Sequence, residues 1–170
     1  QKAKKVPWEK KFLVTGLRQM TSGLKCLHDQ DVIHRDLKPA NILIHMETDG
    51  KFMYKLTDLG LAKNMEGSKN YASSVVGTQV YMSPEAHEGH ADWRTDIWSL
   101  ACIFYEFCTL QRQFKTVLKI AGAITPIPPQ NPQTGENWKD ISALCTKMMS
   151  RTAKSRPSCQ QILDILPKVD

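Results

Sequence analysis

Residues 95–110, TDIWSLACIFYEFCTL, would place apolar side chains on nearly every side of a helix. Such a helix cannot lie on a protein surface, so other elements must surround it at the centre of a domain. Its strongly apolar part, residues 97–105, has nine residues, far fewer than the roughly 20 needed to cross a bilayer. We therefore expect a soluble domain built around this helix, with Asp96 near its start in need of partners.

Three further helices are expected to pack around the central one. The first is amphipathic, because apolar residues recur at spacings of 4, 3, 4 and 3 at Leu13, Leu17, Met20, Leu24 and Leu27. The other two lie around residues 138–149 and 158–166. The last begins with the capping-box pattern Ser158-x-x-Gln161, directly after Pro157.

Two short strand-like runs, residues 41–45 and 51–57, are joined by a segment that contains Asp49-Gly50, a strong hairpin signal. The polar residues 61–82 and the proline-rich residues 125–132 show no sustained period and predict loops. The expected fold is mainly α with a small β-hairpin, and residues 1–170 form one domain.

The five cysteines are an odd number without a CxxC pair. They predict buried, reduced thiols of an intracellular protein, in the cytoplasm or the nucleus, rather than disulfides or a zinc site. The cysteines are Cys26, Cys102, Cys108, Cys145 and Cys159.

The net charge of +6 is concentrated at the start of the chain. Five lysines, at positions 2, 4, 5, 10 and 11, less Glu9 give +4 within residues 1–11. Aromatic side chains do not alternate with these lysines, which favours a solvated helix entry over a surface for nucleic acid or acidic lipid. We expect neither nucleic acid nor membrane as a partner.

The stretch HRDLKPAN, residues 34–41, follows the first helix and carries three chemically distinct groups within six residues. These are the carboxylate of Asp36, the ammonium of Lys38 and the side-chain amide of Asn41. Asn41 stands at the entrance of the predicted hairpin and Asp58 at its exit, so both can face one pocket.

Four further motifs follow in order across roughly 120 residues: DLG (58–60), SPE (83–85), TDIWSL (95–100) and Arg156 before Pro157. Together with HRDLKPAN they resemble the eukaryotic serine/threonine protein kinases, specifically the C-terminal lobe of that α+β domain. Within the family, VVGTQVYMSPE is most similar to the NIMA-related kinases, whereas YKLTDLGLAK is also similar to the IκB-kinase group.

The resemblance implies a site that binds ATP and Mg²⁺ and transfers phosphate to Ser or Thr of a protein substrate. Asp36 would orient the acceptor hydroxyl, and Lys38 would contact the transferring phosphate. Asn41 and Asp58 would bind Mg²⁺. Leu43 would form the apolar floor beneath the adenine.

Other residues take supporting roles in the same resemblance. His34 and Asp96 would be structural, and Thr78 would contact the catalytic aspartate. Glu85 and Arg156 would form a buried ion pair.

Regulation is implied by Arg35, which stands beside the catalytic carboxylate and favours an incoming anion. The best candidate is a phosphate on Ser74, with Ser73 second and Ser68 third, added by an upstream activating kinase. The alternative is that these serines only make a polar loop.

Two features depart from the family pattern. Leu59 replaces the usual Phe and is expected to form an apolar plug behind Asp58. The segment formed by residues 114–119 is shorter than the family's usual connection to the next helix. A substrate-docking surface there is therefore expected to be smaller.

The Gly-rich phosphate loop, the strand lysine and its helix glutamate have no counterpart in the chain. They would belong to an N-terminal lobe preceding Gln1. Two functions follow: the large lobe of an active kinase, or a truncated or pseudokinase-like binding module without turnover. The presence of both Asp36 and Asp58 favours the enzyme, although the isolated chain is expected to be weak or inactive.

Overall fold

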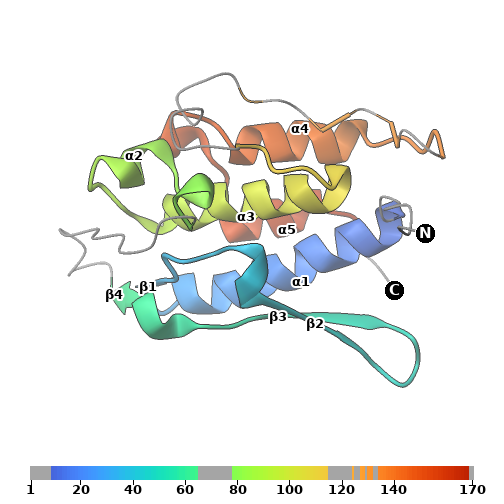
Figure 1. Cartoon of the computed structure of the whole chain (residues 1–170), viewed down its shortest axis with the longest axis horizontal. Coiled ribbons are helices and arrows are strands. Elements are labelled where there is room, and N and C mark those ends of the chain that lie inside the picture. Colours follow the sequence, from blue (N-terminus) through green and yellow to red (C-terminus); the bar gives the residue numbers. More distant parts are fainter. Residues whose placement is uncertain are drawn as a thin grey trace, which may run out of the picture.

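A computed structural model describes residues 9–64, 78–114, 124, 127–128, 130–131 and 134–168. Helix α3, Trp93–Thr109, lies at the centre, between α4 on one side and α1 on the other (Figure 1). Asp92 caps its first turn by accepting a hydrogen bond from the Arg94 backbone N–H. The side chains of residues 95–105 are buried, as the apolar pattern predicts.

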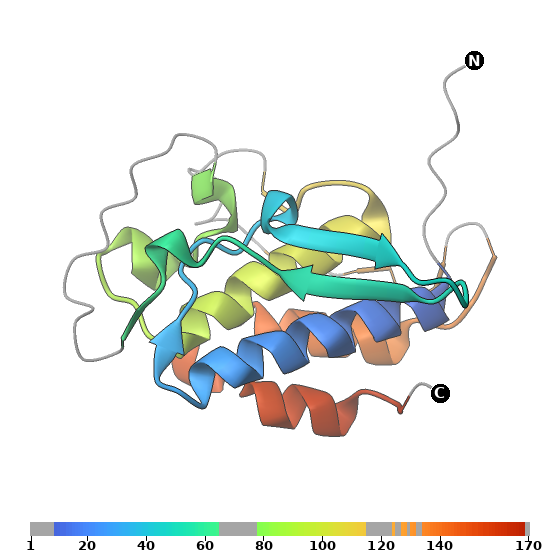
Figure 2. The same ribbon diagram turned by 90° about the horizontal axis from the view of Figure 1, so that it is seen from below.

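Helix α1, Lys10–His28, carries the predicted amphipathic pattern. It contacts α3, the C-terminal helix α5 and strand β3, so each side of its apolar stripe has a partner. Figure 2 shows the β2–β3 hairpin, α1 and α5 in succession. The start of the helix is fixed by Lys10, whose Nζ lies 2.9 Å from Asp140 Oδ1.

The predicted hairpin consists of β2, Ile42–Met46, and β3, Phe52–Leu56, paired antiparallel with Ile42 opposite Leu56. Gly50 adopts a φ of +80° in the turn. The side-chain amide of Gln19 on α1 accepts from the Tyr54 backbone N–H at 2.7 Å and donates to the Phe52 carbonyl at 3.2 Å. Gln19 thus holds the outer edge of β3 against α1.

Gly16 allows α1 and β3 to approach closely, because a Cβ there would lie 3.0 Å from the Tyr54 ring. At Gly23 on the same helix, a Cβ would meet Leu56 at an ordinary 3.4 Å. We expect Gly16→Ala to be about 1–3 kcal/mol less stable than Gly23→Ala in urea unfolding. Gly23→Ala itself is expected to stabilise the protein by about 0.4–1 kcal/mol. Equal stability of the two variants would contradict this packing.

The two C-terminal helices match their predicted positions. Helix α4, Lys139–Met148, packs on α3, and Cys145 Sγ lies 3.6 Å from the Ala101 carbonyl. Helix α5, Cys159–Ile165, begins with the predicted capping box of Ser158 and Gln161.

Two short strands and a short α-helix were not predicted. Val32–Ile33 (β1) pairs antiparallel with Lys63–Asn64 (β4), and the four-residue helix α2 spans Pro84–His87. Strand β4 lies in the segment that was expected to be irregular. Two-residue strands carry no detectable periodicity, and their pairing depends on contacts between distant parts of the chain.

One cysteine prediction is wrong. All five thiols are free, and four are buried, but Cys26 is exposed, because it lies on the side of α1 that faces away from the core. Among the described residues, no helix is both long and apolar enough to cross a membrane.

Candidate active site

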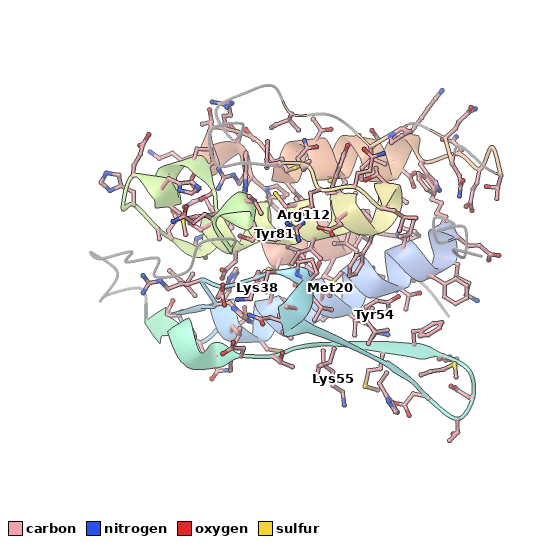
Figure 3. All side chains as sticks on the ribbon, viewed as in Figure 1. Met20, Lys38, Tyr54, Lys55, Tyr81 and Arg112 are labelled. Atoms are coloured by element: carbon pink, nitrogen blue, oxygen red, sulfur yellow. The ribbon has the colours of Figure 1, made fainter. Side chains whose placement is uncertain are left out.

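The loop between β1 and β2 brings together the three polar groups of HRDLKPAN. Lys38 Nζ lies 2.7 Å from Asp36 Oδ2, and Asn41 Nδ2 donates to the same oxygen at 3.1 Å. Asn41 also donates to the Asp36 backbone carbonyl at 2.8 Å. The carboxylate is buried, and within the described part of the chain its Oδ1 accepts no hydrogen bond. Figure 3 shows Lys38 near the entrance of the hairpin.

His34 joins this loop to the exit of the hairpin. Its Nε2 lies 3.1 Å from the Thr57 carbonyl, which can only accept, so Nε2 carries a proton. Its Nδ1 accepts from the Asp36 backbone N–H at 3.4 Å. Thr57 in turn donates from its backbone N–H to the Asn41 carbonyl at 3.0 Å. Asp58, the next residue, is therefore held beside the loop that carries Asp36 and Asn41.

Asp96 fixes the backbone of the loop from the central helix. Its Oδ2 accepts from the His34 backbone N–H at 2.8 Å, and its Oδ1 accepts from the Arg35 backbone N–H at 2.9 Å. His28 Nε2 lies 2.9 Å from Oδ2. These donors supply the partners that a buried carboxylate, 1% exposed, requires.

Two residues of the site adopt a left-handed backbone. Arg35 has a φ of +69° and Asp58 a φ of +62°. Such a conformation costs a non-glycine residue about 1–3 kcal/mol and persists only where surrounding bonds fix it. The Asp96 bond to Arg35 and the His34 bond to Thr57 supply this restraint.

The outer side of the site is open in the described part of the chain. Asp58 is exposed, and one of its oxygens accepts from the Gly60 backbone N–H at 3.3 Å. Leu43 is 55% exposed and Leu59 is 51% exposed. The apolar plug expected at Leu59 stays a prediction, since the described residues leave about half of that side chain exposed.

Glu85 and Arg156 form a bidentate ion pair. Arg156 donates through Nη1 to Glu85 Oε1 at 2.5 Å and through Nη2 to Oε2 at 2.8 Å. The Arg156 side chain is 0% exposed and also donates to the carbonyls of Ser150 and Arg94. The pair joins α2 to the segment before α5, so it anchors the SPE motif to the helical core.

This ion pair makes stability depend on pH. Burial raises the pKa of Glu85, but the hydrogen bonds and charge of Arg156 outweigh it and hold the pKa below its usual 4.5. A depressed pKa contributes stability above pH 4.5 that is lost as the pH falls through the native value. The free energy of unfolding should therefore fall more steeply below pH 4.5 in the wild type than in Glu85→Gln. Parallel curves would contradict this assignment.

A second anchor was not predicted. The Tyr81 hydroxyl donates to Glu106 Oε2 at 2.7 Å, and Arg112 Nε lies 4.0 Å from that oxygen. Burial, then the bond to Glu106, raises the pKa of Tyr81 well above its usual range, so the hydroxyl stays a donor. Figure 3 shows Tyr81 and Arg112 side by side over α3.

Some predicted residues cannot be placed. Ser68, Ser73, Ser74 and most of residues 114–119 lie outside the described residues. Thr78 begins the 3-10 helix Thr78–Tyr81, but its side chain is not among those described. Within the described residues, no group of three or more His, Cys, Asp or Glu could hold a metal ion.

Comparison with known proteins identifies a family and several relatives. The protein kinase domain family matches residues 2–165. The chain is 35% identical over 156 residues to serine/threonine-protein kinase Nek11 of Homo sapiens, covering 86% of the chain and 22% of that protein. It is 34% identical over 162 residues to the probable serine/threonine-protein kinase nek3 of Dictyostelium discoideum, covering 90% of the chain and 14% of that protein.

A third relative, serine/threonine-protein kinase nekl-2 of Caenorhabditis elegans, is 34% identical over 152 residues. The match covers 85% of the chain and 40% of that protein. The chain thus spans less than half the length of each of these relatives.

Proposed function

The chain belongs to the protein kinase family, and from this premise we propose that the protein containing it transfers the γ-phosphate of ATP to Ser or Thr of protein substrates. The observation that carries the proposal is the contact of Lys38 and Asn41 with one oxygen of Asp36. Among the described residues, no group donates a hydrogen bond to the second carboxylate oxygen, which is left for an acceptor hydroxyl. Phosphoryl transfer requires mainly that the acceptor hydroxyl is oriented and that the charge on the phosphate is neutralised.

Lys38 has two roles in the proposed reaction, one toward Asp36 and one toward the phosphate. Its ammonium contacts Asp36 and keeps positive charge beside the carboxylate. When the transferring phosphate enters, the same ammonium can reach it as a point charge. Because Asp36 and Asn41 are buried, these interactions act in a site of reduced water content.

Asn41 and Asp58 fit the requirements of Mg²⁺, which prefers hard oxygen donors and keeps several positions for phosphate and water. Asn41 uses Nδ2 in both of its bonds to Asp36, so its Oδ1 is the atom available to a cation. Asp58 offers a carboxylate at the exit of the hairpin. The bound cation would neutralise charge on the ATP phosphates.

The chain corresponds in our proposal to the larger, C-terminal lobe of the kinase domain. The exposed side chains of Leu43 and Leu59 support this, since both lie where a second lobe and an adenine ring would cover them. The Nek relatives support a place among the NIMA-related kinases. A binding module without turnover has no need of the Asp36, Lys38 and Asn41 cluster, and is not favoured.

The test is Mg²⁺-dependent phosphate transfer by the longest natural form of the protein. It would be incubated with γ-³²P-labelled ATP and dephosphorylated casein, and the labelled amino acids would be separated after hydrolysis. We expect label in phosphoserine and phosphothreonine that disappears when EDTA replaces MgCl₂. Tight ATP binding without any transfer would instead support the binding module and contradict the proposal.

A further inference from the structure

Three side chains from three helices form a chain of contacts behind the catalytic loop. Cys159 Sγ, at the start of α5, lies 3.5 Å from His28 Nδ1, at the end of α1. His28 Nε2 lies 2.9 Å from Oδ2 of Asp96 on α3. The same carboxylate accepts the backbone N–H groups of His34 and Arg35. A thiol is thus connected to the loop that carries Asp36.

The partners of His28 define which nitrogen holds its proton. A carboxylate only accepts, so Nε2 must donate to Asp96. In the neutral ring, Nδ1 then has a lone pair and needs a donor, and the Cys159 thiol is the group that faces it. The hydrogen bond therefore runs from the thiol to His28 and from His28 to Asp96.

Cys, His and Asp in this order also resemble the arrangement of a thiol nucleophile, but the surroundings argue against that use. Burial, then the carboxylates of Asp96 and Asp29, raise the pKa of Cys159 to about 12. The group therefore remains a protonated thiol at neutral pH and acts as a donor, since the thiolate is the reactive form.

Solvent reaches this cluster through a cavity of about 380 Å³ that both His28 and Cys159 line. The charged groups that line it are Lys25, Asp29 and Asp31, and Lys25 Nζ pairs with Asp29 Oδ2 at 2.6 Å. The Trp93 ring lies 6.1 Å from the His28 ring and is not titratable. If the thiol were removed, water from the cavity could replace it. A mobile water would orient the ring less firmly than a side chain fixed at the start of α5.

We propose that Cys159 is a positioning residue of the catalytic loop, because its thiol holds the His28 ring in the orientation in which Nε2–H donates to Asp96. The inference deepens the proposed kinase function, since Asp96 fixes the backbone N–H groups of His34 and Arg35, directly before Asp36. Its test needs no catalysis. The proposal for Cys159 can therefore fail while the kinase assignment stands, and the kinase assignment can fail while the proposal for Cys159 stands.

The experiment compares the ¹⁵N-labelled wild type with Cys159→Ser and Cys159→Ala at neutral pH. Two-bond ¹H–¹⁵N spectra report the protonated nitrogen of His28, and hydrogen exchange reports the His34 and Arg35 amides. We expect only the Nε2–H form in the wild type and in Cys159→Ser, which retains a donor. Cys159→Ala should keep the Nε2 proton that Asp96 requires, but it should show a shifted His28 Nδ1 resonance and about three- to tenfold faster exchange of both amides, as for one lost hydrogen bond.

Cys145→Ala is the matched control, because Cys145 is an equally buried thiol that contacts the Ala101 carbonyl rather than a histidine. It should lower global stability without changing the His28 spectrum. A proton on Nδ1 in the wild type would overturn the proposal, even if Cys159→Ala failed to fold. A Cys159→Ala spectrum and exchange pattern identical to the wild type would also overturn it.

Discussion

Asp36→Asn is expected to lower the rate of phosphate transfer by about 10²- to 10⁴-fold, the range for a positioned acid or base. The amide keeps the shape of the side chain but loses the charge that Lys38 Nζ contacts at 2.7 Å and that would orient the acceptor hydroxyl. ATP affinity should change little, because Asn41 and Asp58 hold the metal in the proposed site. Rates with casein and the affinity for ATP-Mg²⁺ would be measured on the same preparation.

Asp31→Asn provides the matched control for this variant. Asp31 lies five positions earlier, is exposed, and has a φ of +56°, which asparagine accepts readily. The control removes the same charge from the same region and should leave the rate unchanged. If Asp36→Asn retained the wild-type rate, the role assigned to this carboxylate would be wrong.

Glu85→Ala is expected to lower the free energy of unfolding by about 3–5 kcal/mol, because it leaves a buried guanidinium without its counter-charge. The Arg156 side chain is 0% exposed, and its remaining partners are backbone carbonyls. Urea unfolding followed by far-UV circular dichroism would give the difference.

Glu88→Ala removes the same charge three residues later, at an exposed position, and should change stability by less than about 0.5 kcal/mol. Replacing both partners, in Glu85→Ala with Arg156→Leu, should recover part of the loss, since no charge is then stranded. Similar losses in Glu85→Ala and Glu88→Ala would show that the ion pair contributes little.

Much of the fold could be predicted because several signals are local. The central helix follows from an apolar run without a polar face, α5 from its capping box, and the hairpin from Asp49-Gly50. The exposure of Cys26 could not be predicted in the same way. Leu24 and Leu27 of the apolar pattern lie on either side of it, and the rotation of α1 against α3 and β3 decides which side faces water.

The part of the site that depends on specific side-chain types could be predicted from the sequence. Asp36, Lys38 and Asn41 lie close in sequence, so a short loop brings them together. The supporting bonds were harder to foresee. Thr57 acts through its backbone carbonyl, which any residue could supply, and Cys159 reaches His28 across 131 positions. Neither contact leaves a pattern in one sequence.

The attachment of the loop to Asp96 has a consequence for heat inactivation. Asp96 belongs to the most deeply buried helix, so its bonds to His34 and Arg35 persist as long as that helix keeps its neighbours. A loop held this way has no separate melting step at lower temperature. Turnover and the near-ultraviolet signal of the buried tryptophans should therefore disappear together on warming, in a single transition.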